Sequence, residues 1–180
     1  SLYSGLLGNS SAEREARMAE HNADEMVHAL ISLSRRKVGA LIVIGRDSRL
    51  EEYFKTGTMI AAQVSEHLLR NIFFPKAALH DGAVIIREGR IAAAGCVLPL
   101  SDSHHISADL GTRHRAAAGM SEASDAVVVV VSEETGVISV AVGGMLKRHL
   151  DKQSKQGKQF CRCLPFLQSS EYIGKMQWYT

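Results

Sequence analysis

The stretch Leu79–Ala117 constrains the fold of this 180-residue chain most strongly. It begins with the polar block Leu79–Ala83 (LHDGA) and ends with the polar block Gly111–Ala117 (GTRHRAA). The apolar run between the blocks is interrupted at Glu88-Gly89, where glycine supplies the positive φ that a tight hairpin needs. The sequence therefore predicts a hairpin around this turn, short enough to bring both polar blocks to one edge of a sheet.

Other apolar segments predict the rest of the sheet. Val38–Ile44 is apolar without alternation, which is typical of a strand covered on both faces, and we expect it near the centre. Residues 51–54 are expected to form a short edge segment, and a turn at Glu133–Gly136 predicts a second hairpin. The expected strands and strand-like segments are residues 38–44, 51–54, 83–87, 90–98, 126–131 and 137–142.

Helix signals are interleaved with these strands. Ser10 and Glu13 have capping-box spacing, and Asn22–Glu25 offers a second start with an apolar face behind it. One helix that runs through residue 22 and a break at that residue are both compatible with the pattern. Further helices are expected at 61–73, at 112–119 with Thr112 as the cap, and at 145–153. The order of elements predicts an α/β fold, a central mixed β-sheet surrounded by helices.

Composition excludes several classes of protein. The 21 basic and 19 acidic residues leave a net charge of +2, so the chain is no polycation and we expect no nucleic-acid partner. Three cysteines are too few for a disulfide framework and favour a reducing cytoplasm, with Cys96 as a buried thiol. No window reaches the roughly 18 apolar residues of a membrane span, so we expect a soluble domain. The first residue is not methionine, which favours a processed product or an excised fragment.

His80 and Asp81 offer a nitrogen and an oxygen donor at the start of a predicted buried strand. One or two such ligands, completed by water and phosphate oxygens, are typical of protein sites for Mg²⁺ or Mn²⁺. A turn-forming Asp-Gly pair and a structural histidine are the alternatives, and these residues alone do not decide between them. Glu133 and Glu134 could add a metal ligand or form a solvated turn.

Arg113-His114-Arg115 follows Gly111-Thr112 at the expected start of a helix. Free backbone N–H groups and the helix dipole favour an anion there, and cations oppose the dipole unless an anion is bound. The planar guanidinium also matches phosphate oxygens in a bidentate way. A phosphate site and an exposed basic turn are both compatible with this block.

Four motifs together resemble the catalytic domain of bacterial diadenylate cyclases: His80–Ala83, Leu98–Ser101, Leu110–Ala117 and Ser132–Gly136. The similarity covers roughly residues 24–150 and is strongest to the membrane-linked type, in which a linker helix joins transmembrane helices to the domain. The resemblance implies the diadenylate cyclase domain fold. It also implies a linker-helix region at 1–21, a catalytic domain at 22–153 and a C-terminal tail at 154–180, which we expect to be partly ordered.

The resemblance implies that two ATP molecules are condensed into cyclic di-AMP, a bacterial second messenger, with release of two pyrophosphates. Each 3′-hydroxyl attacks the α-phosphorus of the other ATP, so the protein chiefly positions groups and neutralises charge. A metal-dependent nucleotide phosphohydrolase and a non-catalytic ATP-sensing module are the alternatives. The implied partners are ATP, a second copy of the chain in a homodimer with facing active sites, and a membrane-bound regulatory protein. The implied location is the cytoplasmic face of the bacterial cell membrane.

Site residues of three kinds follow from the same resemblance. The catalytic residues are Asp81, Arg113 and Arg115. The metal ligands are His80, Asp81 and Glu134, with Mn²⁺ or Mg²⁺ as the ion and Co²⁺ as a further candidate. Close relatives carry an aromatic residue that stacks on adenine where this chain has Val97. The ATP-binding residues are Gly82, Ala83, Val97, Leu98, Gly111, Thr112, Arg113, His114, Arg115 and Ser132.

Overall fold

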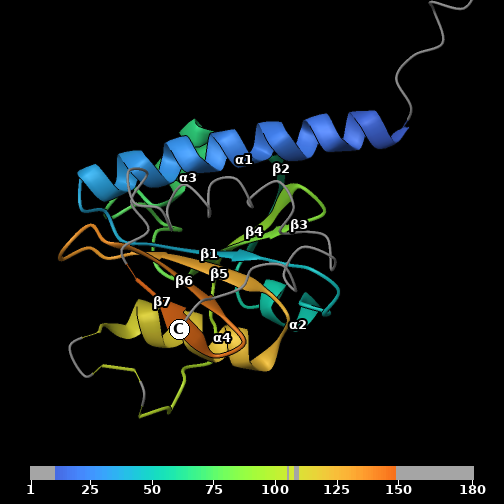
Figure 1. The fold of residues 1–180 in the computed structure, drawn as a ribbon. Coiled ribbons are helices and arrows are strands. Elements are labelled where there is room, and N and C mark those ends of the chain that lie inside the picture. The colour runs from blue at the N-terminus through green and yellow to red at the C-terminus, as the bar shows by residue number, and fades with distance from the viewer. Residues whose placement is uncertain (1–10, 105, 108–109, 149–180) are drawn as a thin grey trace, which may run out of the picture.

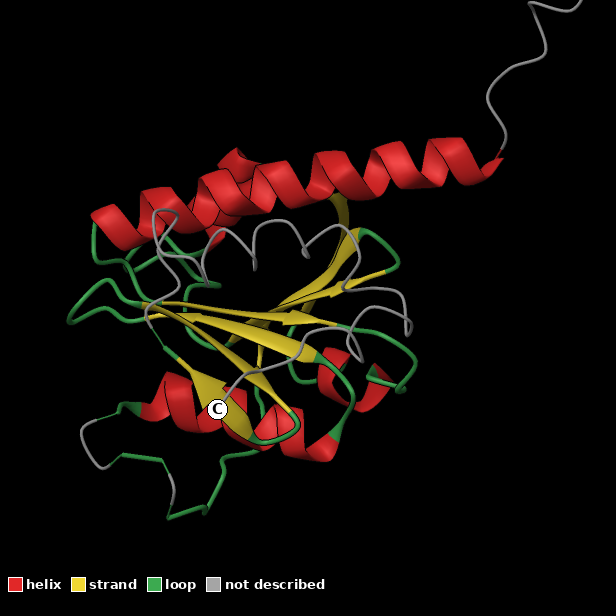
Figure 2. Cartoon of the chain, viewed as in Figure 1, coloured by secondary structure: helices red, strands yellow, loops and turns green. Residues whose placement is uncertain are grey.

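A computed structural model describes residues 11–104, 106–107 and 110–148 of the chain. A seven-stranded mixed sheet lies between two layers of helices, as Figures 1 and 2 show, which confirms the predicted α/β architecture. The elements are α1 (Ser11–Arg35), β1 (Ala40–Ile44), α2 (Glu51–Phe54), β2 (Thr58–Gln63), α3 (Glu66–Ile72), β3 (Ala83–Arg87), β4 (Arg90–Cys96), α4 (Thr112–Ala123), β5 (Val127–Val131), β6 (Ile138–Val142) and β7 (Met145–Lys147).

The strand order is β2-β4-β3-β1-β5-β6-β7, with β1 at the centre as predicted. β1 pairs in parallel with β3 and antiparallel with β5, and its five residues are all buried. Alternate residues of β1 enter two cores: Ile42 packs on the side of α1 and α3, and Val43 on the side of α4. The two helical layers explain why this strand is apolar without alternation.

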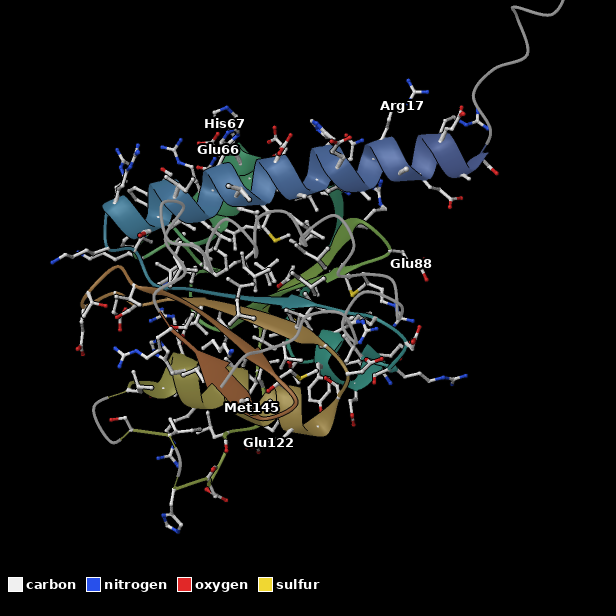
Figure 3. All side chains as sticks on the ribbon, viewed as in Figure 1. Arg17, Glu66, His67, Glu88, Glu122 and Met145 are labelled. Atoms are coloured by element: carbon white, nitrogen blue, oxygen red, sulfur yellow. The ribbon has the colours of Figure 1, made fainter. Side chains whose placement is uncertain are left out.

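Helix α1 is continuous through residue 22. Asn22 is buried, and its side-chain amide donates to the carbonyl of Gly89 at 2.8 Å, so it joins the helix to the β3–β4 turn and starts no new helix. Residues 11–18 are exposed, and Arg17 points away from the body of the protein in Figure 3. The division into regions at residues 21 and 22 stays a prediction. The Ser10 cap lies outside the described residues.

The edge segment expected at residues 51–54 is wrong, and the helix expected at 61–73 is confirmed only for Glu66–Ile72. Residues 51–54 form the short helix α2, and residues 58–63 form strand β2, which covers the free edge of β4. The helix begins only at Glu66, where the Ser65 hydroxyl accepts from the backbone N–H of Leu68 at 3.2 Å. Only residues 61–63 of β2 fall within the expected helix, and their place in the sheet comes from pairing with β4, which the local pattern does not contain.

Helix α4 extends beyond its expected end at Gly119 to Ala123, and it is capped by Gly111, whereas Thr112 is its first residue. Gly119 lies inside the helix. Only glycine fits there, because a Cβ would overlap the carbonyl oxygen of Pro99 and lie 2.7 Å from the Ser101 nitrogen. A glycine that was expected to end the helix instead allows the helix to pack closely against a loop.

The last described element is a strand, where a helix was expected. Gly143 and Gly144 have φ of +55° and +79° and form a turn, after which β7 pairs antiparallel with β6. The predicted helix at 145–153 is therefore wrong for Met145–Lys147. Residues 149–153 and the predicted tail lie outside the described residues. No helix in the described ranges is both long enough and apolar enough to cross a membrane.

Candidate active site

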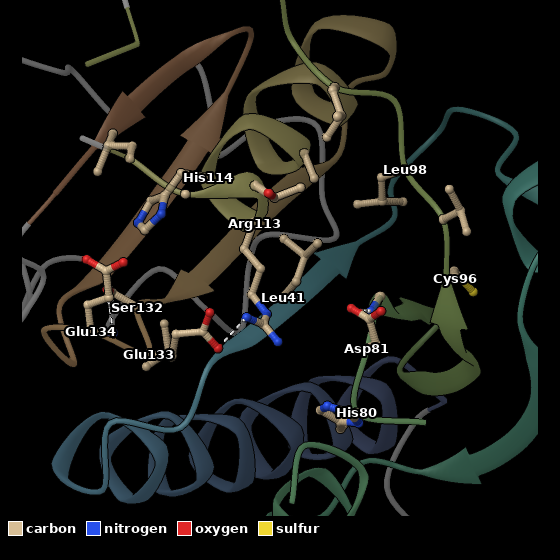
Figure 4. Close-up of a pocket in the computed structure, with 18 of the residues that line it drawn as sticks. Leu41, His80, Asp81, Cys96, Leu98, Arg113, His114, Ser132, Glu133 and Glu134 are labelled. Atoms are coloured by element: carbon tan, nitrogen blue, oxygen red, sulfur yellow. Dashed lines mark hydrogen bonds and ion pairs between the residues drawn. The ribbon is translucent and has the colours of Figure 1, made fainter. Parts of the chain in front are cut away.

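A pocket of about 880 Å³ opens at one edge of the sheet. The strand pairing places the beginning of β1 beside the end of β5, with Ala40 opposite Val131, and the beginning of β3 beside the end of β4, with Ala83 opposite Cys96. The beginning of α4 and the β5–β6 turn complete the lining (Figure 4). The hairpin thus brings the two polar blocks to the same pocket, as predicted.

One side of the pocket, which we call the Asp81 wall, consists of His80, Asp81 and Gly82. Asp81 is exposed, and its carboxylate accepts a hydrogen bond from the backbone N–H of Gly82 at 3.0 Å. Gly82 has a φ of +90°, and a Cβ there would lie 2.7 Å from the carbonyl oxygen of Cys96. The Asp-Gly pair therefore forms a turn and also presents a carboxylate to the pocket, so the two interpretations of the sequence are compatible.

The hydrogen bond made by His80 orients its ring in a way that suits a metal ligand. Its Nδ1 donates to the carbonyl of Ala77 at 2.6 Å, which leaves the lone pair on Nε2 for a cation when the ring is neutral. Glu134 lies on the other side of Arg113 from Asp81 in Figure 4. Within the described ranges, no three side chains of His, Cys, Asp or Glu are grouped as a metal site. The residues present fit a Mg²⁺ or Mn²⁺ ion that takes one or two protein ligands and completes its shell with water and phosphate.

The opposite side, which we call the Arg113 wall, consists of the beginning of α4 and the β5–β6 turn. Arg113 Nη1 donates to Glu133 Oε2 at 2.8 Å, and the arginine side chain is 22% exposed against 62% for Glu133. Gly111, Thr112 and Ser132 line the pocket around this pair. A fixed cation beside the free N–H groups of a helix start is a suitable site for phosphate oxygens.

Arg115 and Ala83 do not line the pocket among the described residues. Arg115 Nη2 donates to the Ser101 carbonyl at 2.9 Å and lies 3.8 Å from Asp102, because residues two apart on a helix point in different directions. Ala83 is fully buried in the core behind the wall. The roles assigned to both residues stay predictions. The predicted site residues that do line the pocket are His80, Asp81, Gly82, Val97, Leu98, Gly111, Thr112, Arg113, His114, Ser132 and Glu134.

Several lining residues were not predicted. Glu133, for which the sequence suggests a metal ligand or a solvated turn, instead accepts a hydrogen bond from Arg113, and no local pattern indicates that contact. Leu41 lines the pocket as the second residue of β1, and nothing in the sequence separates it from its core neighbours. Arg148 also lines the pocket, and no motif marks it.

Cys96, the last residue of β4, and Val97, which follows it, both line the pocket. Burial raises the pKa of the Cys96 thiol to about 11, so the thiol is neutral near pH 7 and is no nucleophile there. Val97 is 65% exposed, whereas the next residue, Leu98, is buried. Val97 therefore presents a small apolar side chain to the opening of the pocket.

Comparison with known proteins identifies the domain. Residues 27–146 match the family model described as DisA bacterial checkpoint controller nucleotide-binding. The chain is 49% identical over 131 residues to the cyclic di-AMP synthase CdaA of Bacillus subtilis, covering 73% of this chain and 48% of that protein. It is 46% identical over 152 residues to a diadenylate cyclase of Listeria monocytogenes, covering 84% and 56%.

The fold has a solved counterpart as well. The crystal structure of a DacA double mutant from Staphylococcus aureus is similar with a TM-score of 0.79 and 43% identity, over 84% of this chain and 97% of that one. The chain spans about half the length of the curated relatives it matches. The matched residues 27–146 contain both walls of the pocket. This chain belongs to the DisA-type nucleotide-binding domain family, the family of the bacterial diadenylate cyclases.

Proposed function

We propose that this domain is a diadenylate cyclase, which condenses two ATP molecules into cyclic di-AMP and releases two pyrophosphates. The observation that carries the proposal is the arrangement of the pocket, in which a carboxylate on one wall faces a fixed guanidinium on the other. Relatives named cyclic di-AMP synthase and diadenylate cyclase share 46–49% identity with the chain across this region, which supports it.

The chemistry requires two in-line displacements. In each, a 3′-hydroxyl oxygen forms a bond to an α-phosphorus, the bond to the pyrophosphate oxygen breaks, and the hydroxyl proton is lost. Asp81 would accept or relay this proton and hold a divalent cation together with His80 Nε2. Arg113, with the N–H groups at the start of α4, would neutralise phosphate charge as it moves to the leaving group. A bound Mg²⁺ or Mn²⁺, with Co²⁺ as a further candidate, would supply charge neutralisation.

The pocket contains one Asp81 wall and one Arg113 wall, yet the reaction joins two nucleotides. We therefore propose that two copies face each other with their Asp81 walls across the shared substrates, since a twofold product suits a twofold assembly. Glu134 would then serve the metal of its own pocket or that of the facing copy. Specific activity should fall on dilution; activity that stays constant far below the dimer dissociation constant would contradict this arrangement.

The location and a regulatory partner are proposed from the resemblance to the membrane-linked type. In the full-length protein, α1 would connect this domain to the cytoplasmic face of the membrane, where a membrane-bound protein would regulate it. The exposure of residues 11–18 on α1 is compatible with such a connecting segment. Co-purification of the full-length protein with membranes, and its release on removal of the residues before α1, would test the location.

The experiment that tests the function is incubation with ATP and Mn²⁺ or Mg²⁺, followed by mass analysis of the products. A cyclase yields cyclic di-AMP and pyrophosphate. A phosphohydrolase yields ADP or AMP with inorganic phosphate or pyrophosphate and no cyclic product. A sensing module leaves ATP unchanged. Either of the last two outcomes would reject the proposal.

A further inference from the structure

Three residues from separate parts of the chain meet at the guanidinium of Arg113. Glu133, from the β5–β6 turn, accepts from Nη1 at 2.8 Å. Gly39, immediately before β1, lies so close that a Cβ there would be 2.7 Å from Nη1, 2.8 Å from Cζ and 3.1 Å from Glu133 Oε2. The ion pair therefore rests against the backbone of Gly39.

A glycine at position 39 leaves the space that the Arg113 guanidinium occupies. Its φ is not among the positive values found at other glycines of the described chain, so an alanine could adopt this backbone conformation without strain. The atoms that an alanine would meet first are the mobile end of the Arg113 side chain. The protein could therefore accommodate the methyl group by moving the guanidinium, which would change the site with little effect on the fold.

Holding the Arg113 guanidinium in this position costs free energy, which its hydrogen bond to Glu133 offsets. Arg113 Nε is buried and has no hydrogen-bond partner among the described residues, and the cation lies in the first turn of α4, where the helix dipole opposes it. Glu133 is the one side chain in the described ranges that binds this guanidinium. Without it, the long side chain would gain solvation and rotamer freedom by leaving this position.

We infer that Glu133 and Gly39 are positioning residues, which hold the Arg113 guanidinium in place on the Arg113 wall, where it would meet phosphate oxygens, before nucleotide binds. The inference rests on the proposed function for its ligand, a nucleoside triphosphate. Glu133 fixes Nη1 by a charge-assisted hydrogen bond, and the space above Gly39 fixes where the planar group lies. The second terminal nitrogen, Nη2, is then available to phosphate oxygens.

Two neutral replacements of Glu133 separate positioning from charge. Glu133→Gln and Glu133→Ala both remove a negative charge near the phosphates, but only glutamine keeps an oxygen that can accept from Nη1. We expect Glu133→Ala to bind α,β-methylene-ATP, which cannot react at the α-phosphorus, about tenfold more weakly than Glu133→Gln does. Adenosine, which lacks phosphates, should bind both variants equally. Calorimetric titration gives these dissociation constants without turnover.

Gly39→Ala provides the second test, because it displaces the same group from the other side. In the Gly39→Ala background, the difference between Glu133→Gln and Glu133→Ala should shrink to less than about twofold, since the two sites act through one guanidinium. Glu20→Ala, on the exposed part of α1, and Gly45→Ala, at the far end of β1, are matched controls that should leave nucleotide affinity unchanged. Thermal melts establish that each variant is folded.

The outcomes separate this inference from the proposed function. Equal affinities of Glu133→Gln and Glu133→Ala for the analogue would overturn the inference, even if the parent protein makes cyclic di-AMP. So would a difference that persists in full when Gly39 is alanine. Conversely, a tenfold difference that Gly39→Ala removes supports the inference even if mass analysis of the parent finds no cyclic product, a result that would reject the proposed function alone.

Discussion

The two walls of the pocket are built in different ways. On the Arg113 wall, the charged group is partly buried and already bound to a side chain from another part of the fold. On the Asp81 wall, the carboxylate is exposed and its described hydrogen bond is to the backbone N–H of the next residue. The backbone of the Asp81 wall is nevertheless the more constrained of the two, because Gly82 has a positive φ and lies close to the backbone of Cys96 in the neighbouring strand.

This difference is compatible with the ligands proposed for each wall. A guanidinium has a fixed planar shape and needs only to be held in place for phosphate oxygens. A carboxylate that binds a metal must be free to accept the geometry that the cation demands, with water and phosphate as further ligands. The Arg113 wall is therefore organised before the ligand arrives, whereas the Asp81 wall would be completed by cation, nucleotide and a second copy of the chain.

The largest expected effect comes from removing the exposed charge. Asp81→Asn should lower formation of cyclic di-AMP by about 1000-fold, because a neutral amide neither holds a divalent cation well nor accepts the hydroxyl proton. The melting temperature should change by no more than about 2 °C, since the side chain is exposed and has no distant partner among the described residues. A variant that keeps a tenth of the parent activity would show that this wall is not the reactive one.

A pair of glycine substitutions compares the backbones of the two walls. Gly82→Ala should lower the free energy of unfolding by about 2–4 kcal/mol, from the positive φ and the contact with Cys96. Gly111→Ala, on the Arg113 wall, has nothing within 4 Å of the added Cβ and should cost about 1 kcal/mol or less, as at other helix caps. Urea unfolding measures both, and equal losses would remove the distinction between the walls.

The sequence predicts the Asp81 wall better than the Arg113 wall, for a physical reason. His80, Asp81 and Gly82 are adjacent in sequence, and the hairpin that follows them has a clear turn signal, so local rules place them correctly. The pair of Arg113 and Glu133 joins residues twenty positions apart through the packing of α4 on the sheet. No local pattern contains that contact, nor the closeness of Gly39 to it.

The same limit explains the errors in the fold. The central strands and the two hairpins were predicted because their residues are buried on both faces or flanked by turns. The end of edge strand β2, at residues 61–63, and the whole of edge strand β7 are expected as helix from the local pattern, since an edge position is decided by the neighbouring strand that needs a partner. The local pattern predicts a helix end at Gly119, because the loop at Pro99 that requires a glycine there is twenty residues away in sequence.

A smaller effect concerns the opening of the pocket next to the Asp81 wall. Val97→Tyr should lower the KM for ATP about fivefold to tenfold, because an aromatic ring at this 65% exposed position could stack on the base, and such stacking contributes about 1–3 kcal/mol. Activity at saturating ATP should change little, since the phosphates would lie elsewhere. Val97→Leu, which adds apolar volume without a ring, is the control; an equal gain in that variant would exclude stacking as the cause.

The smallest expected effect lies outside both walls, at Asp125 in the turn after α4. Its carboxylate accepts from the backbone N–H groups of Asp47 and Ser48 at 3.1 and 3.0 Å. Burial alone would raise the pKa of Asp125, but hydrogen bonds from Ser48 and Asp47, with the charge of Arg46, outweigh burial and lower it. The folded state therefore prefers the ionised carboxylate.

This preference gives a stability contribution with a definite pH dependence. It is fully present above the pKa of the unfolded chain, about 4, and is lost as the pH falls through the lower pKa of the folded state. Asp125→Asn should therefore lower the free energy of unfolding at pH 7 by less than about 1 kcal/mol, because solvent screens this partly exposed carboxylate, and the difference from the parent should shrink as the pH falls below about 4. Glu51→Gln, an exposed acid on α2, is the control. A loss of unfolding free energy that stays constant with pH would mean that the amide disturbs packing. The charge of Asp125 would then contribute nothing to holding the C-terminal end of α4, the end away from Arg113.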